Sequence, residues 1–191
     1  MIEKPKDWDS TPAYDGEMAR LTPGGHICRI LHILQTQSKN NKPMIAVQFD
    51  IEEGGNFDGF YLRQHKDRKK QNDAAKYQGV IRYLLYNKEG GTNPYFKGFI
   101  KSLEESNDGY LWNWDEKSAE GKKIGIIFRE EEYKDNNGLI RDSVRPYQVR
   151  SVQMILDGVP VPDKKRIAEH ASQPFDPIAG FVAANNEELP F

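Results

Sequence analysis

Three arginines and one tyrosine lie between residues 141 and 150. Arg141, Arg145 and Tyr147 share parity along a predicted strand, and Arg150 follows them. Residues of one parity in a strand point to one face, so two guanidinium groups and a ring should lie together. Guanidinium groups hold phosphates and aromatic rings stack on bases, which is the chemistry that a single nucleic-acid strand requires. The alternative is an ordinary exposed strand face on which Tyr147 closes the core.

A second stretch, residues 61–82, interleaves basic and aromatic groups. The candidates for nucleic-acid contact in this stretch are Tyr61, Arg63, Lys69, Lys70, Tyr77 and Arg82. A mobile basic loop beside a groove could follow a phosphate backbone. A charge run is more often only a solvated loop, but the basic density here favours contact with nucleic acid. Lys39 and Lys42 add two cations in a polar turn between predicted strands.

The last five residues form a compact docking peptide. Phe191 can fill an apolar pocket while its α-carboxylate meets a cation on a partner, and Pro190 limits the conformational entropy lost on binding. Leu189 adds apolar surface, and Glu187 and Glu188 can steer the peptide towards a basic rim. We therefore expect a protein partner to bind here. The alternative is a frayed chain end.

Catalytic and metal-binding patterns are weak. His26, Cys28 and His32 are not followed by a second ligand cluster, whereas structural zinc normally needs four ligands. Glu130 and Glu132 could hold Mg²⁺ in a nuclease or annealing enzyme, and this alternative stays open. Phosphate-binding glycine motifs are absent from the sequence. We expect a protein that is not an enzyme and needs no cofactor.

Two tryptophans, Trp112 and Trp114, precede a predicted strand. A stacking platform for bases is conceivable. Aromatic residues contribute much of the burial in small cores, so we favour a structural role in which the pair seals one end of the fold.

Most of the predicted elements are strands. Residues 26–34 and 44–51 form a hairpin, and Ile45, Val47, Phe49 and Ile51 alternate cleanly with their neighbours. Residues 57–63 are predicted as a third strand, and 77–86 could be helix or strand. Residues 95–103 have helical spacing of apolar side chains. Residues 122–133 and 139–156 supply a second hairpin around a turn at 135–138, with one helical turn at the end.

This order predicts a mainly β fold. A helix between the third and fourth strands is typical of the five-stranded OB-fold barrel, which commonly binds oligonucleotides. Residues 64–94 would be an insertion after strand 3. We divide the chain into an irregular N-terminal arm (1–23), an OB-fold domain (24–156), and a linker with a disordered or irregular acidic C-terminal interaction tail (157–191).

Charge and composition limit the kinds of binding surface and the cellular location that we expect. The net charge is −2, of which Asp176, Glu187 and Glu188 contribute −3, so the rest of the chain carries +1. A phosphate-binding face must therefore come from local arrangement. One cysteine excludes an internal disulfide. No stretch has the length of a transmembrane segment and the N-terminus lacks a signal-peptide pattern, so we expect a cytoplasmic protein without membrane contact.

Short blocks of the sequence also resemble a family of phage and prophage proteins encoded among replication and recombination genes. The matching blocks are GHICRI (25–30), KPM (42–44), FDI (49–51), FKGFI (96–100), ESN (105–107), WNWD (112–115), GKKIG (121–125) and EEY (131–133). The last five residues resemble the acidic tip of bacterial and phage single-stranded DNA-binding proteins. The resemblance implies an OB-fold protein that binds single-stranded DNA in the cytoplasm of a bacterial host, without a cofactor.

Together these observations predict a protein that coats single-stranded DNA in phage or prophage replication or recombination. Its C-terminal tip would recruit replication or recombination proteins, and a homo-oligomer is left open. The alternative function is an OB-fold adaptor for a recombinase or replisome that binds no DNA itself.

Overall fold

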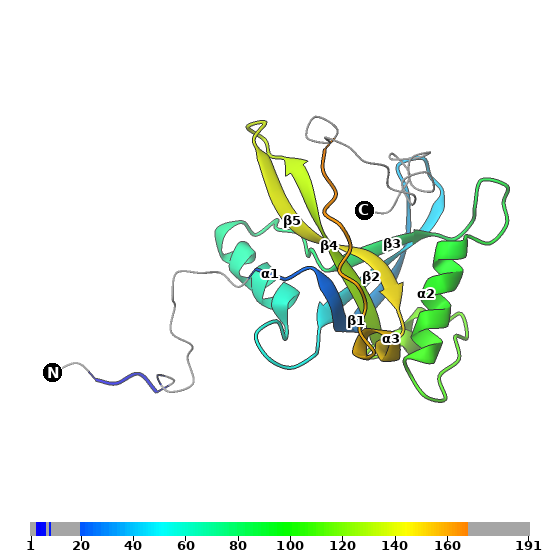
Figure 1. Cartoon of the computed structure of the whole chain (residues 1–191), viewed down its shortest axis with the longest axis horizontal. Helices are drawn as coiled ribbons and strands as arrows, with labels where there is room; N and C mark the ends of the chain where they lie inside the picture. The colour runs from blue at the N-terminus through cyan, green and yellow to red at the C-terminus, as the bar shows by residue number, and fades with distance from the viewer. Residues whose placement is uncertain (1–2, 7, 9–19, 168–191) are drawn as a thin grey trace.

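A computed structural model describes residues 3–6, 8 and 20–167 of the chain (Figure 1). The strands are β1 (Gly24–Gln37), β2 (Pro43–Ile51), β3 (Val80–Leu84), β4 (Lys123–Lys134) and β5 (Ile140–Arg150). The helices are α1 (Phe60–Gln71), α2 (Pro94–Glu105) and α3 (Val152–Leu156), with a short 3₁₀-helix, η1 (Glu116–Ala119). The described part of the chain is therefore mainly β, as predicted.

The five strands form one antiparallel sheet in the order β3-β2-β1-β4-β5. β1 is the central strand. Its first half pairs with β4, from Gly24 opposite Phe128 to Arg29 opposite Lys123, and residues 28–37 pair with β2. The β1–β2 and β4–β5 hairpins project from the same side of the molecule (Figure 1). This order, with a helix between β3 and β4, is consistent with an OB-like fold.

The periodic strands are where the sequence places them. In β2, Ile45, Val47, Phe49 and Ile51 are all buried as predicted, but Ala46 and Asp50 of the other parity are buried as well, so the alternation is not clean. Ile124, Ile126 and Phe128 of β4 are buried as well. β-Branched and aromatic side chains of one parity thus form the inner face of the sheet.

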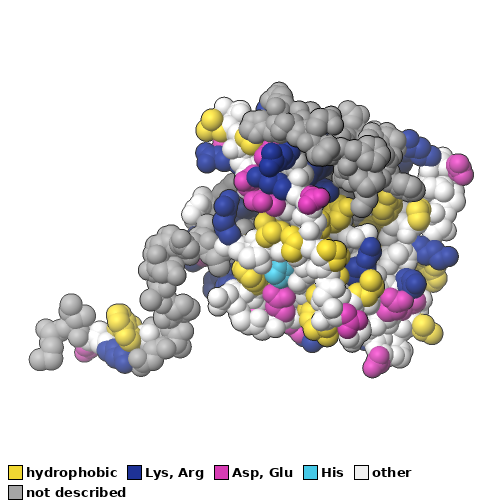
Figure 2. Space-filling model, in the orientation of Figure 1, with side chains coloured by type: hydrophobic (Ala, Val, Ile, Leu, Met, Phe, Trp, Pro, Cys, Tyr) yellow, Lys and Arg dark blue, Asp and Glu magenta, His cyan; other side chains and the backbone are white. Residues whose placement is uncertain are grey.

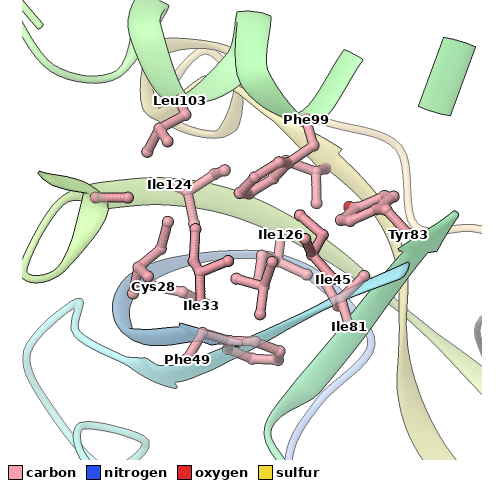
Figure 3. Close-up of a cluster of buried hydrophobic side chains, with 14 of the residues drawn as sticks. Cys28, Ile33, Ile45, Phe49, Ile81, Tyr83, Phe99, Leu103, Ile124 and Ile126 are labelled. Atoms are coloured by element: carbon pink, nitrogen blue, oxygen red, sulfur yellow. The ribbon is translucent and has the colours of Figure 1, made fainter. Parts of the chain in front are cut away.

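Helix α2 covers this core and confirms the helix predicted at 95–103. It begins because the Asn93 side chain accepts a hydrogen bond from the Tyr95 N–H, and Pro94 follows the cap. Figure 3 shows Phe99 and Leu103 pointing from α2 into the cluster. The Phe99 ring stacks on that of Tyr83 in β3, with centroids 5.1 Å apart. Helix α2 therefore joins an outer strand of the sheet to the core.

The predicted third strand at 57–63 is wrong. Helix α1 starts in this segment, and the third strand is β3, inside the ambiguous stretch 77–86. The helix forms because the Asp50 carboxylate, from β2, accepts the N–H groups of Tyr61 (2.8 Å) and Leu62 (3.0 Å). Gly59, with φ +66°, turns the chain into the helix. The inserted helix consequently comes before strand 3, not after it.

Residues 157–167 lie against the sheet. The side chains of Val159 and Val161 face Gly25 and Gly24 at the start of β1. The Lys165 N–H donates to the Glu130 carbonyl and its carbonyl accepts from the Glu132 N–H, each at 2.9 Å. This segment forms one parallel bridge to β4, between Lys165 and Glu131, beyond the residues that pair with β1.

The rest of the predicted tail and most of the predicted N-terminal arm fall outside the described residues. Among the residues that are described, none of the helices has the length and apolar character required to cross a lipid bilayer.

Candidate nucleic-acid interface

The β4–β5 hairpin carries a face on which arginine and tyrosine side chains meet. The register sets Arg129 opposite Arg145, and Tyr133 opposite Arg141. Phe128, paired with Pro146, has the opposite parity and points to the core. Arg141 and Arg145 therefore share the outer face, as their spacing predicts.

Two arginine–tyrosine contacts organise this face. The Arg129 guanidinium carbon lies 4.1 Å from the centre of the Tyr147 ring, and that of Arg145 lies 5.7 Å from the centre of the Tyr133 ring. Both distances are within the range of cation–π attraction. The two pairs bring cations and aromatic surfaces together within one hairpin, and we call this set of four residues the Arg–Tyr face.

Carboxylates offset part of its charge. The Arg129 Nη2 lies 2.7 Å from Glu131 Oε1, and both side chains are only about 15% exposed. Arg141, at the edge of the face, donates to Asp135 at 3.1 Å. This hydrogen bond holds the pKa of Asp135 below its ordinary value. Arg145 donates to the neutral Ser143 hydroxyl and, within the described residues, has no carboxylate partner.

Figure 2 shows Lys and Arg side chains around this hairpin, with Asp and Glu side chains among them. The mixture agrees with the near-neutral charge of the chain. A phosphate would therefore be held by particular guanidinium groups and not by a broad positive field.

The other basic residues predicted to contact DNA lie on different parts of the molecule. Arg150 is half-buried at the end of β5 and donates to the Val149 carbonyl. Arg82 is exposed on β3, Lys39 is exposed in the β1–β2 turn, and Lys42 in the same turn is half-buried. The β1–β2 turn lies at the end of a hairpin that projects to the same side as β4–β5 (Figure 1).

The predicted role of Tyr61 in base stacking is wrong, because its ring is part of the core. The residue is only 5% exposed, and its ring packs on those of Phe49 and Phe128. Burial raises the pKa of its hydroxyl. Tyr77 is half-buried, and its hydroxyl donates to the Phe49 carbonyl at 2.9 Å. Tyr77 therefore offers only part of its ring to a ligand.

The basic stretch after Tyr61 is a helix and not the mobile loop that the charge run suggests. Arg63 donates to the backbone carbonyls of Asn56 and Asp58, so it fastens α1 to the preceding turn. Lys70 forms an ion pair with Asp67 at 2.8 Å. Lys69 is exposed and lines a cleft between α1 and the sheet.

The two tryptophans have different environments. Trp112 packs against the core, as the sequence favours. Trp114 is 76% exposed and has φ +66°, a left-handed conformation that is unusual for a bulky residue. The expectation that both rings seal the fold is therefore wrong for Trp114.

The residues considered for metal binding have other partners. His26 is buried, with Nδ1 2.8 Å from Glu53 and Nε2 2.9 Å from the Thr22 carbonyl. Lys164 lies 3.5 Å from Glu132 and 2.7 Å from Asp142, so a cation already lies beside Glu132, one of the two carboxylates considered for Mg²⁺. Over the described ranges, no three His, Cys, Asp or Glu side chains converge as metal ligands.

Sequence reasoning missed Arg129 and Tyr133 as members of the face. Both were placed in a strand, but their partners are set by the β4–β5 register, which shifts between Ile127 and Phe128. The predicted partner-binding residues 187–191 lie outside the described residues.

No protein-family model matches the chain, and no curated protein sequence matches it significantly.

Proposed function

We propose that the protein binds single-stranded DNA through the Arg–Tyr face of its β4–β5 hairpin. The observation that carries the proposal is the pair of arginine–tyrosine contacts, Arg129 on Tyr147 and Arg145 on Tyr133. The Arg145–Tyr133 pair is exposed and offers a ring for a base beside a donor for a phosphate, and sequence-tolerant binding of single strands uses this combination. The less exposed Arg129–Tyr147 pair lies on the same face.

The pairing also favours a single strand over a duplex. Stacking on a ring needs an unpaired base whose face is open, which a base inside a helix does not offer. The OB-like strand order also supports nucleic-acid binding, since such sheets commonly hold oligonucleotides. Arg145 is the side chain to which we assign the main phosphate contact, because its described partners are neutral.

We further propose that this binding serves phage or prophage replication or recombination in a bacterial cytoplasm. The resemblance of the short sequence blocks supports this setting. Residues 187–191 would recruit a replication or recombination protein, with Phe191 in an apolar pocket and its carboxylate on a cation.

Titration of the protein with fluorescent oligo-dT at several salt concentrations tests the proposal. We expect binding that weakens as salt rises, with Arg145→Glu binding much more weakly than the wild type. Lys97→Glu makes the same change in net charge at an exposed position of α2, and this variant should bind nearly as the wild type does. Absence of wild-type binding at low salt would overturn the proposal and favour the adaptor function.

Deletion of residues 187–191 separates the two roles of the chain. We expect unchanged or tighter DNA binding, because the deletion removes two carboxylates that could compete for the basic groups. Recruitment of the partner should be lost. A clear fall in DNA affinity would contradict the division of roles.

A further inference from the structure

A second candidate binding site lies between helix α1 and the sheet. Leu62, His65 and Lys69 line one wall, and their spacing puts them on one face of α1. Leu31, His32 and Gln48 of β1 and β2 also line the cleft, as do Asp73, Ala74, Ala75 and Tyr77 from the segment after α1. The cleft is open to solvent and has a volume of about 440 Å³.

The wall from α1 carries a polar group without a partner. The Nδ1 atom of His65 is enclosed and forms no hydrogen bond in the described structure. The Tyr77 ring meets the imidazole edge-on, with centroids 5.5 Å apart. Buried polar atoms are nearly always hydrogen-bonded, so Nδ1 gains a partner from a ligand only if the imidazole turns towards the cleft when the ligand binds.

The remaining walls fit a flat ring with a polar edge. Leu31, Leu62 and the Tyr77 ring supply apolar surface, and Leu62 is 50% exposed even though it faces the sheet. Leu31 is available because β1 shifts register between Ile30 and His32, which leaves it without a partner in β2. The Tyr77 hydroxyl is already bound to a carbonyl, so Tyr77 offers its ring alone.

The polar groups in the cleft match a nucleobase better than a phosphate. Gln48 and a neutral imidazole each bring both a donor and an acceptor, and Asp73 brings acceptors only. A phosphate requires donors, and the Asp73 carboxylate would repel it. A base edge carries both kinds of group. Lys69 is the one lysine or arginine in the lining and is suited to the phosphate attached to that base.

We infer that this cleft holds one nucleobase of a bound single strand, with His65 on the base edge and Lys69 near its phosphate. The inference rests on the proposed function, because it assigns a base-binding position to the same ligand. The Arg–Tyr face supplies stacking and phosphate contacts. The cleft would add a third contact, one that requires a base.

The first test uses thymidine 5′-monophosphate and adenosine 5′-monophosphate as probes. Nuclear magnetic resonance of protein with labelled histidine rings should show the His65 signals moving as nucleotide is added, while the buried His26 signals stay fixed. Ribose 5-phosphate, which has no base, should leave the His65 signals in place. Equal movement with ribose phosphate, or no movement with either nucleotide, would overturn the inference.

The second test compares oligo-dT with an oligonucleotide of abasic residues. His65→Ala and Leu62→Asn should each weaken oligo-dT binding by about tenfold, the size expected for one stacked base, and leave abasic binding unchanged. Gln64→Ala, beside His65 but outside the cleft lining, is the matched control. Wild-type affinity in both cleft variants would overturn the inference. If the wild type binds no oligonucleotide, the proposed function fails. The mononucleotide experiment still decides whether the cleft binds a base.

Discussion

The Arg129 guanidinium contacts both Tyr147 and Glu131. Its central carbon lies 4.1 Å from the centre of the Tyr147 ring, and its Nη2 lies 2.7 Å from the Glu131 carboxylate. One side chain is therefore held by both a ring and an anion. These two contacts already restrict the side chain, so little side-chain entropy remains to be lost when a strand binds. The same carboxylate, however, reduces the attraction of Arg129 for a phosphate.

Replacing Glu131 by glutamine should therefore strengthen binding of single-stranded DNA. The change keeps the shape of the side chain and removes the charge that offsets Arg129. We expect the plot of log affinity against log salt to become steeper by about 0.7, the value for one added phosphate contact on a single strand. Fluorescence titration over a range of salt measures it. Glu105→Gln on α2, which loses the ion pair with Lys101, is the control, and an equal gain there would point to a non-specific charge effect.

Asp50 should be essential for the stability of α1. Its carboxylate accepts three backbone N–H groups, from Ile51, Tyr61 and Leu62. Asp50→Asn places an NH₂ group where an acceptor is needed, and we expect a loss of about 2–3 kcal/mol in the free energy of unfolding, as for hydrogen bonds to charged groups. Urea unfolding measures it. Asp58→Asn, on an exposed turn where the carboxylate accepts one long bond from the Gly54 N–H, should cost far less.

Alanine in place of Gly125 and alanine in place of Gly98 should change the stability of the protein in opposite directions. A Cβ at Gly125 would lie 2.8 Å from the Ser151 carbonyl and 2.9 Å from the Arg150 carbonyl, so the backbone must move. We expect Gly125→Ala to destabilise the protein by about 1–3 kcal/mol. Gly98 lies inside α2 with open space around it, and Gly98→Ala should stabilise the protein by up to about 1 kcal/mol. Thermal unfolding of both variants checks the pair, and a change of the same sign in both would refute the packing argument.

The backbone at Trp114 should be strained. Its φ of +66° costs an ordinary residue about 1–2 kcal/mol, whereas asparagine tolerates this region. The indole is 76% exposed, so Trp114→Asn loses little burial and should raise the free energy of unfolding by about 1 kcal/mol. Leu111→Asn removes an equally exposed side chain, outside the left-handed region, and should bring no gain. A loss of stability in Trp114→Asn would show that the ring contacts of Trp114 outweigh the strain.

Cys28 should resist thiol reagents while the protein is folded. The side chain is fully buried in the core. Burial, with smaller contributions from Glu53 and Asp50, raises the pKa of the thiol well above its ordinary value. Because only the thiolate reacts, raising the pH from 7 to 9 should bring almost no reaction with a disulfide reagent, and denaturant should bring one equivalent. Rapid reaction of native protein at pH 8 would contradict this burial.

Periodic patterns made part of the fold predictable. β2 and the helix at 94–105 follow from side chains that repeat every two residues or along one helical face, and no distant residue is needed to explain them. α1 could not be predicted in the same way. Its N-terminus is completed by Asp50, from a different element, and the apolar residues Phe57 and Tyr61 also fit a strand.

The candidate interface was predictable to a similar extent. Parity alone indicated that Arg141 and Arg145 share a face. Pairing with Arg129 and Tyr133 depends on a register shift in β4 that no local pattern marks. The burial of Tyr61 could not be inferred, because its position among basic residues resembles that of an exposed ring.

The central position of β1 has a consequence for how the chain folds. β1 is synthesised first, but one of its edges is completed only when β4 pairs Ile124 with Cys28, after α1, β3 and α2 have been made. Until then the β1–β2–β3 portion has an open strand edge, and such edges can join to those of other chains. Folding that depends on so distant a pairing is slow for a domain of this size, on the order of milliseconds to seconds. Conditions that delay synthesis of β4 should therefore favour aggregation of the nascent chain.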